Sequence, residues 1–197
     1  MDITERYAFD QYVLRQKFFK LFGASFHIFD PQGNVVLFSK QKAFKIKEDI
    51  RVYTDESLET EALVIRTQSI FDIAGTYDVF DPIANETVGA VKRKGLKSLL
   101  KDEWLILDAQ GNEIGKVVED STLKAIVRRV VEAATLIIPS AYHVEIGGQT
   151  AAVFKQDFNP FLRKFNLDFT HDTTDQLDPR LGIAAAILLC AIEGDGN

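Results

Sequence analysis

Residues 181–192 of this chain, which read LGIAAAILLCAI, are apolar on every face of the helix that they predict. Asp178 is a good N-cap residue, Pro179 suits the first helical position, and Gly194 follows the apolar run as a stop signal. About a dozen residues at 1.5 Å each give a helix of about 18 Å, whereas a bilayer span requires about 20 residues. We therefore expect the protein's own strands to enclose this helix.

The segments before this helix repeat a hairpin pattern, in which an apolar run is followed by an acidic residue, a Gly- or Asn-rich turn and a second apolar run. Asp and Pro initiate such turns, and Gly or Asn adopts the positive φ that they require. The pattern occurs at residues 26–38, 77–89, 104–115 and 142–154, and further strands are expected at 12–19, 50–53, 62–67 and 161–169. Short strands at this spacing predict an antiparallel barrel or sandwich.

Residues 121–134 differ from the rest, because their apolar side chains recur at helical spacing with Lys124, Arg128 and Arg129 toward the other side. We interpret this segment as an amphipathic helix that packs on the barrel, since its apolar face lacks Trp and Phe. The predicted fold class is mainly β (α+β): an antiparallel sheet closed around a buried C-terminal hydrophobic helix, with one extra amphipathic helix, and the resemblance described below implies a closed antiparallel β-barrel of about 12 strands. No Ser- or Pro-rich linker interrupts the chain, so we expect a single domain over residues 1–197.

The charge balance and the cysteine content exclude some classes of function. The chain carries 23 Lys and Arg against 29 Asp and Glu, a net charge of −6, which disfavours nucleic acid as a partner. Cys190 is the single cysteine, so no internal disulfide forms, and its apolar neighbours predict a buried, inert thiol. Residues 1–6 lack the basic start and apolar core of an export signal, and we expect a cytoplasmic protein.

The four hairpins, the basic strand and turn at residues 88–94 (VGAVKRK) and the closing apolar helix resemble one group of proteins. This group contains the phospholipid scramblases, the plant LURP-one-related proteins and the tubby C-terminal domain, and the resemblance covers nearly the whole chain. It implies a barrel of about a dozen strands around a C-terminal hydrophobic helix, in agreement with the residue pattern.

The resemblance also implies functional expectations. Tubby domains bind phosphoinositide headgroups through basic side chains, scramblases carry an acidic, calcium-linked segment before the terminal helix, and LURP-one-related proteins have no settled biochemical activity. The basic run that resembles a headgroup site here consists of Lys92, Arg93, Lys94, Lys97 and Lys101. The acidic segment consists of Asp168, Asp172, Asp175 and Asp178, although its spacing differs from that of the scramblase segment.

The basic run permits two interpretations. Clustered ammonium and guanidinium groups can bind phosphate, because they neutralise its charge and donate hydrogen bonds. Lys92 and Lys94 also share one face of a strand, as solvated lysines on exposed strands do, and this second interpretation is the stronger one. A second basic set joins the run only if the barrel brings the two strands together; it consists of Lys40, Lys42, Lys45 and Lys47.

The acidic segment, with His171 among its aspartates, offers oxygen ligands of the kind that calcium prefers. Its order does not match an EF-hand loop, Asp178 is explained as an N-cap, and Asp172 and Asp175 suit an ordinary loop. We therefore favour a structural role for Asp168, Asp172 and Asp175 over metal binding and expect no cofactor.

The sequence lacks a catalytic constellation. His27 and His143 lie within predicted strands, and no Gly-x-Ser-x-Gly, His-Glu-x-x-His or Gly-rich phosphate-loop motif occurs. We therefore expect a protein that is not an enzyme.

Three hypotheses of function follow. The first is a soluble, non-catalytic binding module that recognises an anionic membrane lipid or another anionic ligand through the basic run, with no transmembrane span and with peripheral membrane contact. The second is a scramblase-like lipid-transport protein with a calcium-linked acidic segment. The third is a scaffold that binds a protein partner. Resemblance of fold alone does not choose among them.

Overall fold

The computed structural model describes residues 1–19, 23–41, 49–67, 75–94, 103–120, 140–157 and 162–192. Within these ranges a short helix, α1 (Ile3–Arg6), precedes twelve strands, and helix α3 (Pro179–Ile192) follows them. The strands are β1 (Gln11–Phe19), β2 (Gly23–Phe29), β3 (Val35–Gln41), β4 (Ile50–Tyr53), β5 (Glu61–Thr67), β6 (Thr76–Asp81), β7 (Glu86–Arg93), β8 (Trp104–Leu107), β9 (Glu113–Glu119), β10 (Ala141–Ile146), β11 (Gln149–Gln156) and β12 (Arg163–Asp168).

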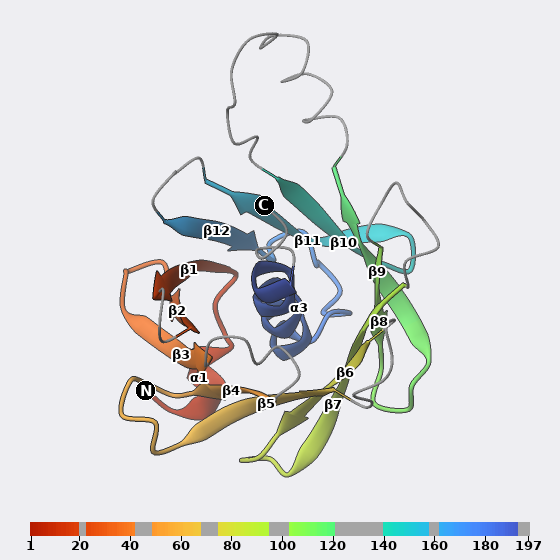
Figure 1. Ribbon diagram of the computed structural model, residues 1–197. Coiled ribbons are helices and arrows are strands. Elements are labelled where there is room, and N and C mark those ends of the chain that lie inside the picture. The colour runs from red at the N-terminus through yellow and green to blue at the C-terminus, as the bar shows by residue number, and fades with distance from the viewer. Residues whose placement is uncertain are drawn as a thin grey trace, which may run out of the picture.

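The strands form a closed antiparallel barrel in which each strand pairs with its neighbours in sequence. The barrel closes where β1 pairs with β12, with Gln11 opposite Asp168 and Gln16 opposite Arg163. Figure 1 shows the resulting ring of strands with α3 inside it. Closure leaves no unpaired sheet edge, which removes a route to aggregation. The predicted barrel around a C-terminal helix is therefore confirmed.

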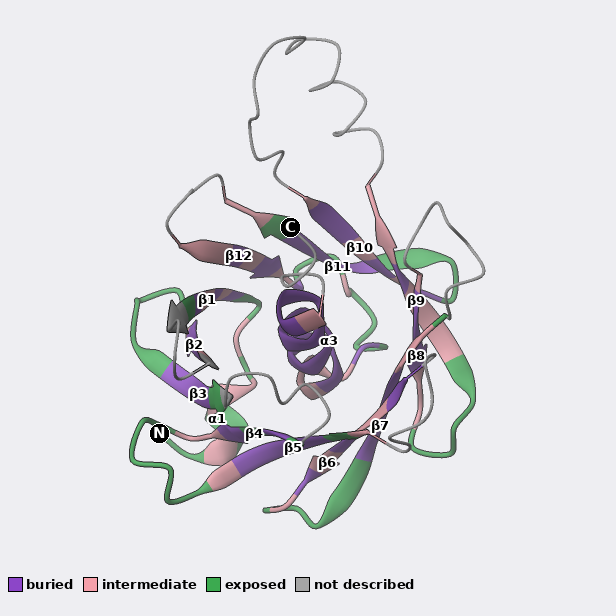
Figure 2. Cartoon of the chain, in the orientation of Figure 1, coloured by how far each residue is buried: buried purple, intermediate pink, exposed green. Residues whose placement is uncertain are grey.

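Helix α3 is buried along nearly its whole length, as Figure 2 shows. Ile183, Ala184, Ile187 and Leu188 are 0% exposed, and Cys190 is buried as the sequence predicts. Side chains from the strands pack around the helix in one apolar cluster, including Phe26, Leu63, Trp104 and Phe154. Burying an aliphatic or aromatic side chain of this kind contributes about 1.5–3 kcal/mol, so an all-round apolar helix is stable only inside such a wall.

The first turn of α3 is built as predicted. The Asp178 carboxylate accepts a hydrogen bond from the backbone N–H of Arg180 at 2.9 Å, and Pro179 occupies the first helical position. Gly182 allows the ring of Phe169 to lie against the helix, because a Cβ at this position would stand 2.4 Å from Phe169 Cε1.

Two hairpins use the same five-residue turn, DPQGN at residues 30–34 and DAQGN at residues 108–112. In both, the Asp carboxylate accepts hydrogen bonds from the backbone and side-chain N–H groups of the Asn, at 2.8 Å and 2.8 Å in the first turn and 2.8 Å and 2.9 Å in the second. The glycines at 33 and 111 have φ values of 87° and 84°. These two turns therefore form for the reason expected from the sequence: Asp accepts hydrogen bonds within the turn, and Gly adopts the positive φ.

Two predicted features lie outside the described residues. These are the amphipathic helix at 121–134 and the stop signal Gly194.

Candidate functional site

The two ends of the barrel differ in charge. Because the barrel is an antiparallel meander, all odd-numbered strands finish at the same end, which we call the rim, and begin at the opposite end, which we call the base. Helix α3 begins at the base, where Arg180 contacts Asp81 and Glu86 of the β6–β7 hairpin. It ends toward the rim, where the Cys190 carbonyl accepts a hydrogen bond from Arg163 at the start of β12.

Cations are frequent among the described residues of the rim. They lie at or near the last positions of odd-numbered strands or the first positions of even-numbered ones: Lys17, Lys40, Arg66, Lys92, Arg93, Lys94, Lys155, Arg163 and Lys164. Arg51, on the short strand β4, instead pairs with Glu61 at the start of β5. Fewer carboxylates lie beside the rim cations, and some form ion pairs there, such as Glu103 with Lys94 at 3.0 Å and Asp157 with Lys164 at 2.7 Å.

Carboxylates are frequent among the described residues of the base. They include Asp2, Glu5, Asp10, Asp30, Asp55, Glu56, Glu59, Asp81, Glu86, Asp108, Glu113, Asp172, Asp175 and Asp178. Two arginines also lie at the base, and both form hydrogen bonds or ion pairs with groups of this end. Arg6 donates to the carbonyl oxygens of Val36 and Thr54 at 2.6 and 2.7 Å, and Arg180 binds three carboxylates.

Three of the five predicted headgroup residues lie at the end of β7. Lys92 lies between Thr76 and Leu105 in the sheet register, Arg93 lies opposite Trp104, and the exposed Lys94 follows the strand. The Arg93 guanidinium lies over the Trp104 ring, 5.8 Å from its centroid, which is within the distance of about 6 Å typical of a cation–π contact. Lys97 and Lys101 lie outside the described residues.

The structure does not bring the second basic set beside this run. Lys40 lies one residue before the end of β3, and β4, β5 and β6 separate that strand from β7. The two strands finish at the same end of the barrel but on different parts of its wall. Lys42, Lys45 and Lys47 lie outside the described residues.

The acidic segment consists of carboxylates that hold the loop before α3. Asp168 Oδ1 accepts hydrogen bonds from the backbone and hydroxyl of Thr170 at 3.0 and 2.6 Å, and Asp172 Oδ2 accepts one from the Leu177 backbone at 2.7 Å. Asp175 has a positive φ of 50°. Within the described ranges, no three His, Cys, Asp or Glu residues are grouped so that they could hold a metal ion.

Burial and hydrogen bonds act in opposite directions on Asp168. Burial disfavours the charged form of the carboxyl, but the hydrogen bonds from Thr170 and the nearby His171 outweigh it and lower the pKa of Asp168. The carboxylate is therefore ionised at neutral pH.

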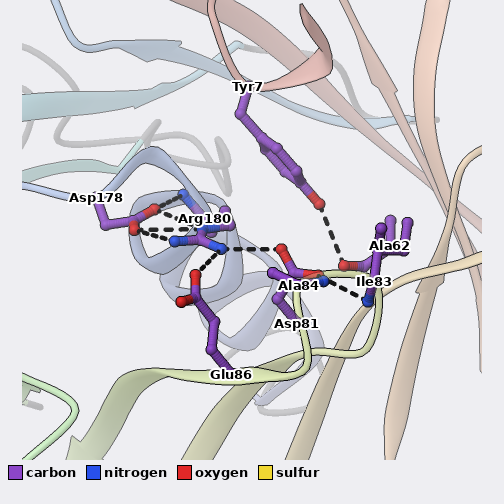
Figure 3. Close-up of polar contacts among 8 residues, drawn as sticks. All are labelled: Tyr7, Ala62, Asp81, Ile83, Ala84, Glu86, Asp178 and Arg180. Carbon is purple, nitrogen blue, oxygen red and sulfur yellow. Dashed lines mark hydrogen bonds and ion pairs between the residues drawn. The ribbon is translucent and has the colours of Figure 1, made fainter. Parts of the chain in front are cut away.

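A network around Arg180 was not predicted from the sequence. Its guanidinium lies between Asp178, at 2.7 Å, and Asp81 and Glu86, both at 2.8 Å (Figure 3). The hydrogen bond with Asp178 and those with the other two carboxylates raise the pKa of Arg180 further above its usual range. The same Asp81 carboxylate accepts from the backbone N–H groups of Ile83 and Ala84, both at 2.9 Å, so the network ties α3 to the β6–β7 turn.

Tyr7 lies beside this network (Figure 3). Its hydroxyl donates a hydrogen bond to the Ala62 carbonyl at 3.4 Å, and burial, with the nearby Asp81 carboxylate, raises the pKa of Tyr7 well above its usual range. The phenol is therefore neutral and structural.

His27 is buried on β2, and its Nε2 lies 2.7 Å from Glu56 of the β4–β5 loop. Its ring contacts those of Phe29 and Phe38. Among the described atoms, His27 Nδ1 has no hydrogen-bond partner. These contacts anchor the β4–β5 loop on the outer wall.

A groove of about 340 Å³ crosses the outer wall of β11, β12 and β1. Its lining includes Gln11, Val13, Lys155, Asn166 and Asp168, with His171 from the loop that follows β12. Asp168 was predicted as a site residue, whereas Lys155 and Gln11 were not. No local pattern of residues indicates this groove, because its three strands come from opposite ends of the chain.

The closed barrel and its enclosed helix define the class of protein as a β-barrel around a C-terminal helix. Comparison with known proteins then gives the family. The LURP-one-related family model matches residues 35–190, so the chain belongs to the LURP-one-related family. The X-ray structure of a protein from Arabidopsis thaliana aligns with 98% of this chain and 96% of that chain, with 11% identity and a TM-score of 0.50. This likeness concerns the fold. No curated protein matches the chain.

Among the helices described here, none has the length and apolar character needed to cross a membrane.

Proposed function

We propose that this LURP-one-related barrel is a non-catalytic binding module that recognises anionic lipid headgroups with its rim. The observation that carries the proposal is the separation of charge along the barrel axis. The net charge of −6 would repel an anionic surface if it were spread evenly. Instead, the rim gathers cations and the base gathers carboxylates.

The distance between the two ends makes this separation effective. A strand of 9 residues such as β1 is about 30 Å long, and a tilt of about 40° leaves roughly 20 Å along the barrel axis. The Debye length at physiological ionic strength is about 8 Å. A surface that meets the rim is therefore screened from the carboxylates of the base.

The rim cations suit phosphate-bearing headgroups. Lys17, Lys40 and Lys94 are exposed, and Lys17 and Lys40 flank Ser25 in one cross-strand row. The pair between Lys94 and Glu103 is exposed and therefore weak, so phosphate can replace the carboxylate. Each Lys or Arg near an anionic leaflet contributes about 1 kcal/mol to binding.

Vesicle co-sedimentation tests the proposal, with phosphatidylserine-containing vesicles compared with pure phosphatidylcholine vesicles at low and physiological salt. We expect binding only to the anionic vesicles, and the double substitution Lys92→Ala and Lys94→Ala should weaken it about 30-fold. Arg93 stays unchanged in this variant because it also contacts Trp104.

The matched control changes charge at the base. Glu59 and Glu113 are both exposed, and Glu59→Gln with Glu113→Gln raises the net charge by two without touching the rim. Its affinity should stay close to that of the parent protein. No binding to anionic vesicles at low salt, or an increase in the control as large as the loss in the rim variant, would overturn the proposal. A strict calcium requirement would favour the scramblase-like alternative.

A further inference from the structure

We propose that the outer groove across β11, β12 and β1 binds a small solute that carries one anionic group and one ammonium group at its two ends. Its anionic group would lie at Lys155 and its ammonium group at Asp168. Of the rim cations named above, only Lys155 lines the groove, and binding there does not depend on the proposed headgroup binding.

The groove has the size and surface of a small-molecule site. Its volume of about 340 Å³ lies at the lower end of the range that is common for ligand pockets. Val13 and Val153 supply apolar surface, while Gln11 and Asn166 add amide side chains whose hydrogen bonds run to Asp168 and Asp157, respectively. A few polar groups on an apolar lining are typical of sites that orient a ligand.

One end of the groove offers an ammonium group. Within the described part of the chain, Lys155 is exposed and has no ion-pair partner. The neighbouring carboxylate of Asp157 does not neutralise it, because its oxygens accept from Lys164 Nζ at 2.7 Å and Asn166 Nδ2 at 2.5 Å. Lys155 is therefore available to an anionic ligand.

The other end offers a carboxylate. Asp168 lines the groove opposite Val153 on one side and Gln11 on the other. The hydrogen bonds from Thr170 fix its position, and they keep it ionised. An ammonium group is the complementary partner for such a carboxylate.

The register of β11 and β12 sets the backbone spacing of the two residues that carry these charges. Lys155 faces Asn166 and Val153 faces Asp168, so Lys155 and Asp168 are diagonal neighbours. Diagonal pairs in an antiparallel sheet are about 7–8 Å apart. Two extended residues also span about 7 Å, so an unblocked dipeptide matches the spacing. A glycerophosphoethanolamine headgroup carries the same two charges and is the second source of this chemistry.

The test is an NMR titration of the full chain, labelled with ¹⁵N, with glycylglycine and separately with glycerophosphoethanolamine, without lipid. We expect saturable shifts around Lys155 and Asp168. N-acetylglycylglycine, which lacks the ammonium group, and glycylglycinamide, which lacks the carboxylate, should each bind about fivefold more weakly or worse than glycylglycine. The parent compound that binds more tightly identifies the source of the ligand.

Protein variants complete the test. Lys155→Ala and Asp168→Asn should each weaken binding by a similar factor, and Lys155→Arg should restore it. Lys116→Ala is the matched control, because Lys116 lies on β9 in an ion pair with Glu145 at 3.3 Å, away from the groove. If Asp168→Asn does not fold, the comparison of glycylglycine with its two blocked forms, N-acetylglycylglycine and glycylglycinamide, still tests whether both charges are needed. Equal affinity for blocked and unblocked compounds, no saturable shift, or binding lost in Lys92→Ala with Lys94→Ala but kept in Lys155→Ala would overturn the inference.

Discussion

At the base of the barrel, charged side chains are bonded to backbone groups and to one another, whereas at the rim several cations extend from strand ends into solvent. Asp30, Asp81 and Asp108 each accept hydrogen bonds from the turns in which they lie. Lys17 and Lys40, in contrast, are exposed. Charge at the base therefore maintains the fold, and charge at the rim is available to a partner. Neutralising the first should reduce stability, and neutralising the second should reduce binding.

The largest expected effect is at the base, in Arg180→Ala. The variant leaves Asp81, which is 4% exposed, as a buried carboxylate without its cation. Removing one partner of a buried ion pair costs about 3–5 kcal/mol, and the partial exposure of Arg180 places the expected loss near 3 kcal/mol. Urea unfolding followed by circular dichroism measures it.

Asp81→Asn in the Arg180→Ala background provides the matched comparison. The amide removes the uncompensated charge while its oxygen can still accept from the N–H groups of Ile83 and Ala84. Part of the lost stability should return. A loss below about 0.5 kcal/mol in Arg180→Ala, the range of an ordinary surface substitution, would show that the network does not hold α3 to the wall.

The two similar turns at residues 30–34 and 108–112 give a smaller expected effect on stability. Burial disfavours the ionised form of Asp30, but its hydrogen bonds with Asn34 and the turn backbone outweigh this and lower its pKa. Asp30→Asn should cost about 1 kcal/mol at pH 7, because Asp30 is buried and its charged hydrogen bonds are lost. Asp108→Asn, in the same turn but more exposed, should cost less. Urea unfolding of the two variants side by side measures the difference.

Asp30 and Asp108 also predict how the stability of the fold changes at acid pH. The pKa values of Asp30 and Asp108 are lower in the folded state than in the unfolded chain, so their contribution is complete above the ordinary Asp pKa of about 3.9. It is lost as the pH falls below that value and through the folded pKa. Asp30→Asn should therefore flatten the fall of stability below about pH 4. An unchanged slope would contradict the structural role of this charge.

The sequence predicted those parts of the fold that depend on local signals. The apolar helix, its Asp178 cap and the Asp–Gly–Asn hairpins were found because capping, turn chemistry and hydrophobic periodicity act over a few residues. The strand at Ile50–Tyr53 has the bounds that alternation predicted. The residues also indicated a sheet closed around this helix, the group resemblance implied about a dozen strands, and the structure confirms both.

The contacts between distant segments could not be predicted in the same way. Arg180 meets Asp81 and Glu86 across 99 and 94 residues, and nothing local to these residues indicates the pairing. The groove has the same origin, because it combines β1 with β11 and β12. The separation of charge could have been predicted from the sequence. In a meander, successive turns lie at alternate ends of the barrel. Grouping every second turn would therefore have shown that the acidic turns lie together at the base.

The smallest expected effect on stability is at the rim, in Lys17→Ala with Lys40→Ala. These lysines lie in one row on either side of Ser25 and extend into solvent, so each should change the free energy of unfolding by no more than about 0.5 kcal/mol. Their removal also lowers the positive charge of the rim by two, and binding to anionic vesicles should weaken about 30-fold. Urea unfolding and vesicle co-sedimentation on the same preparation measure both quantities. A stability loss as large as that of Asp30→Asn, with binding unchanged, would mean that rim charge maintains the fold just as base charge does, and the contrast between the two ends would not hold.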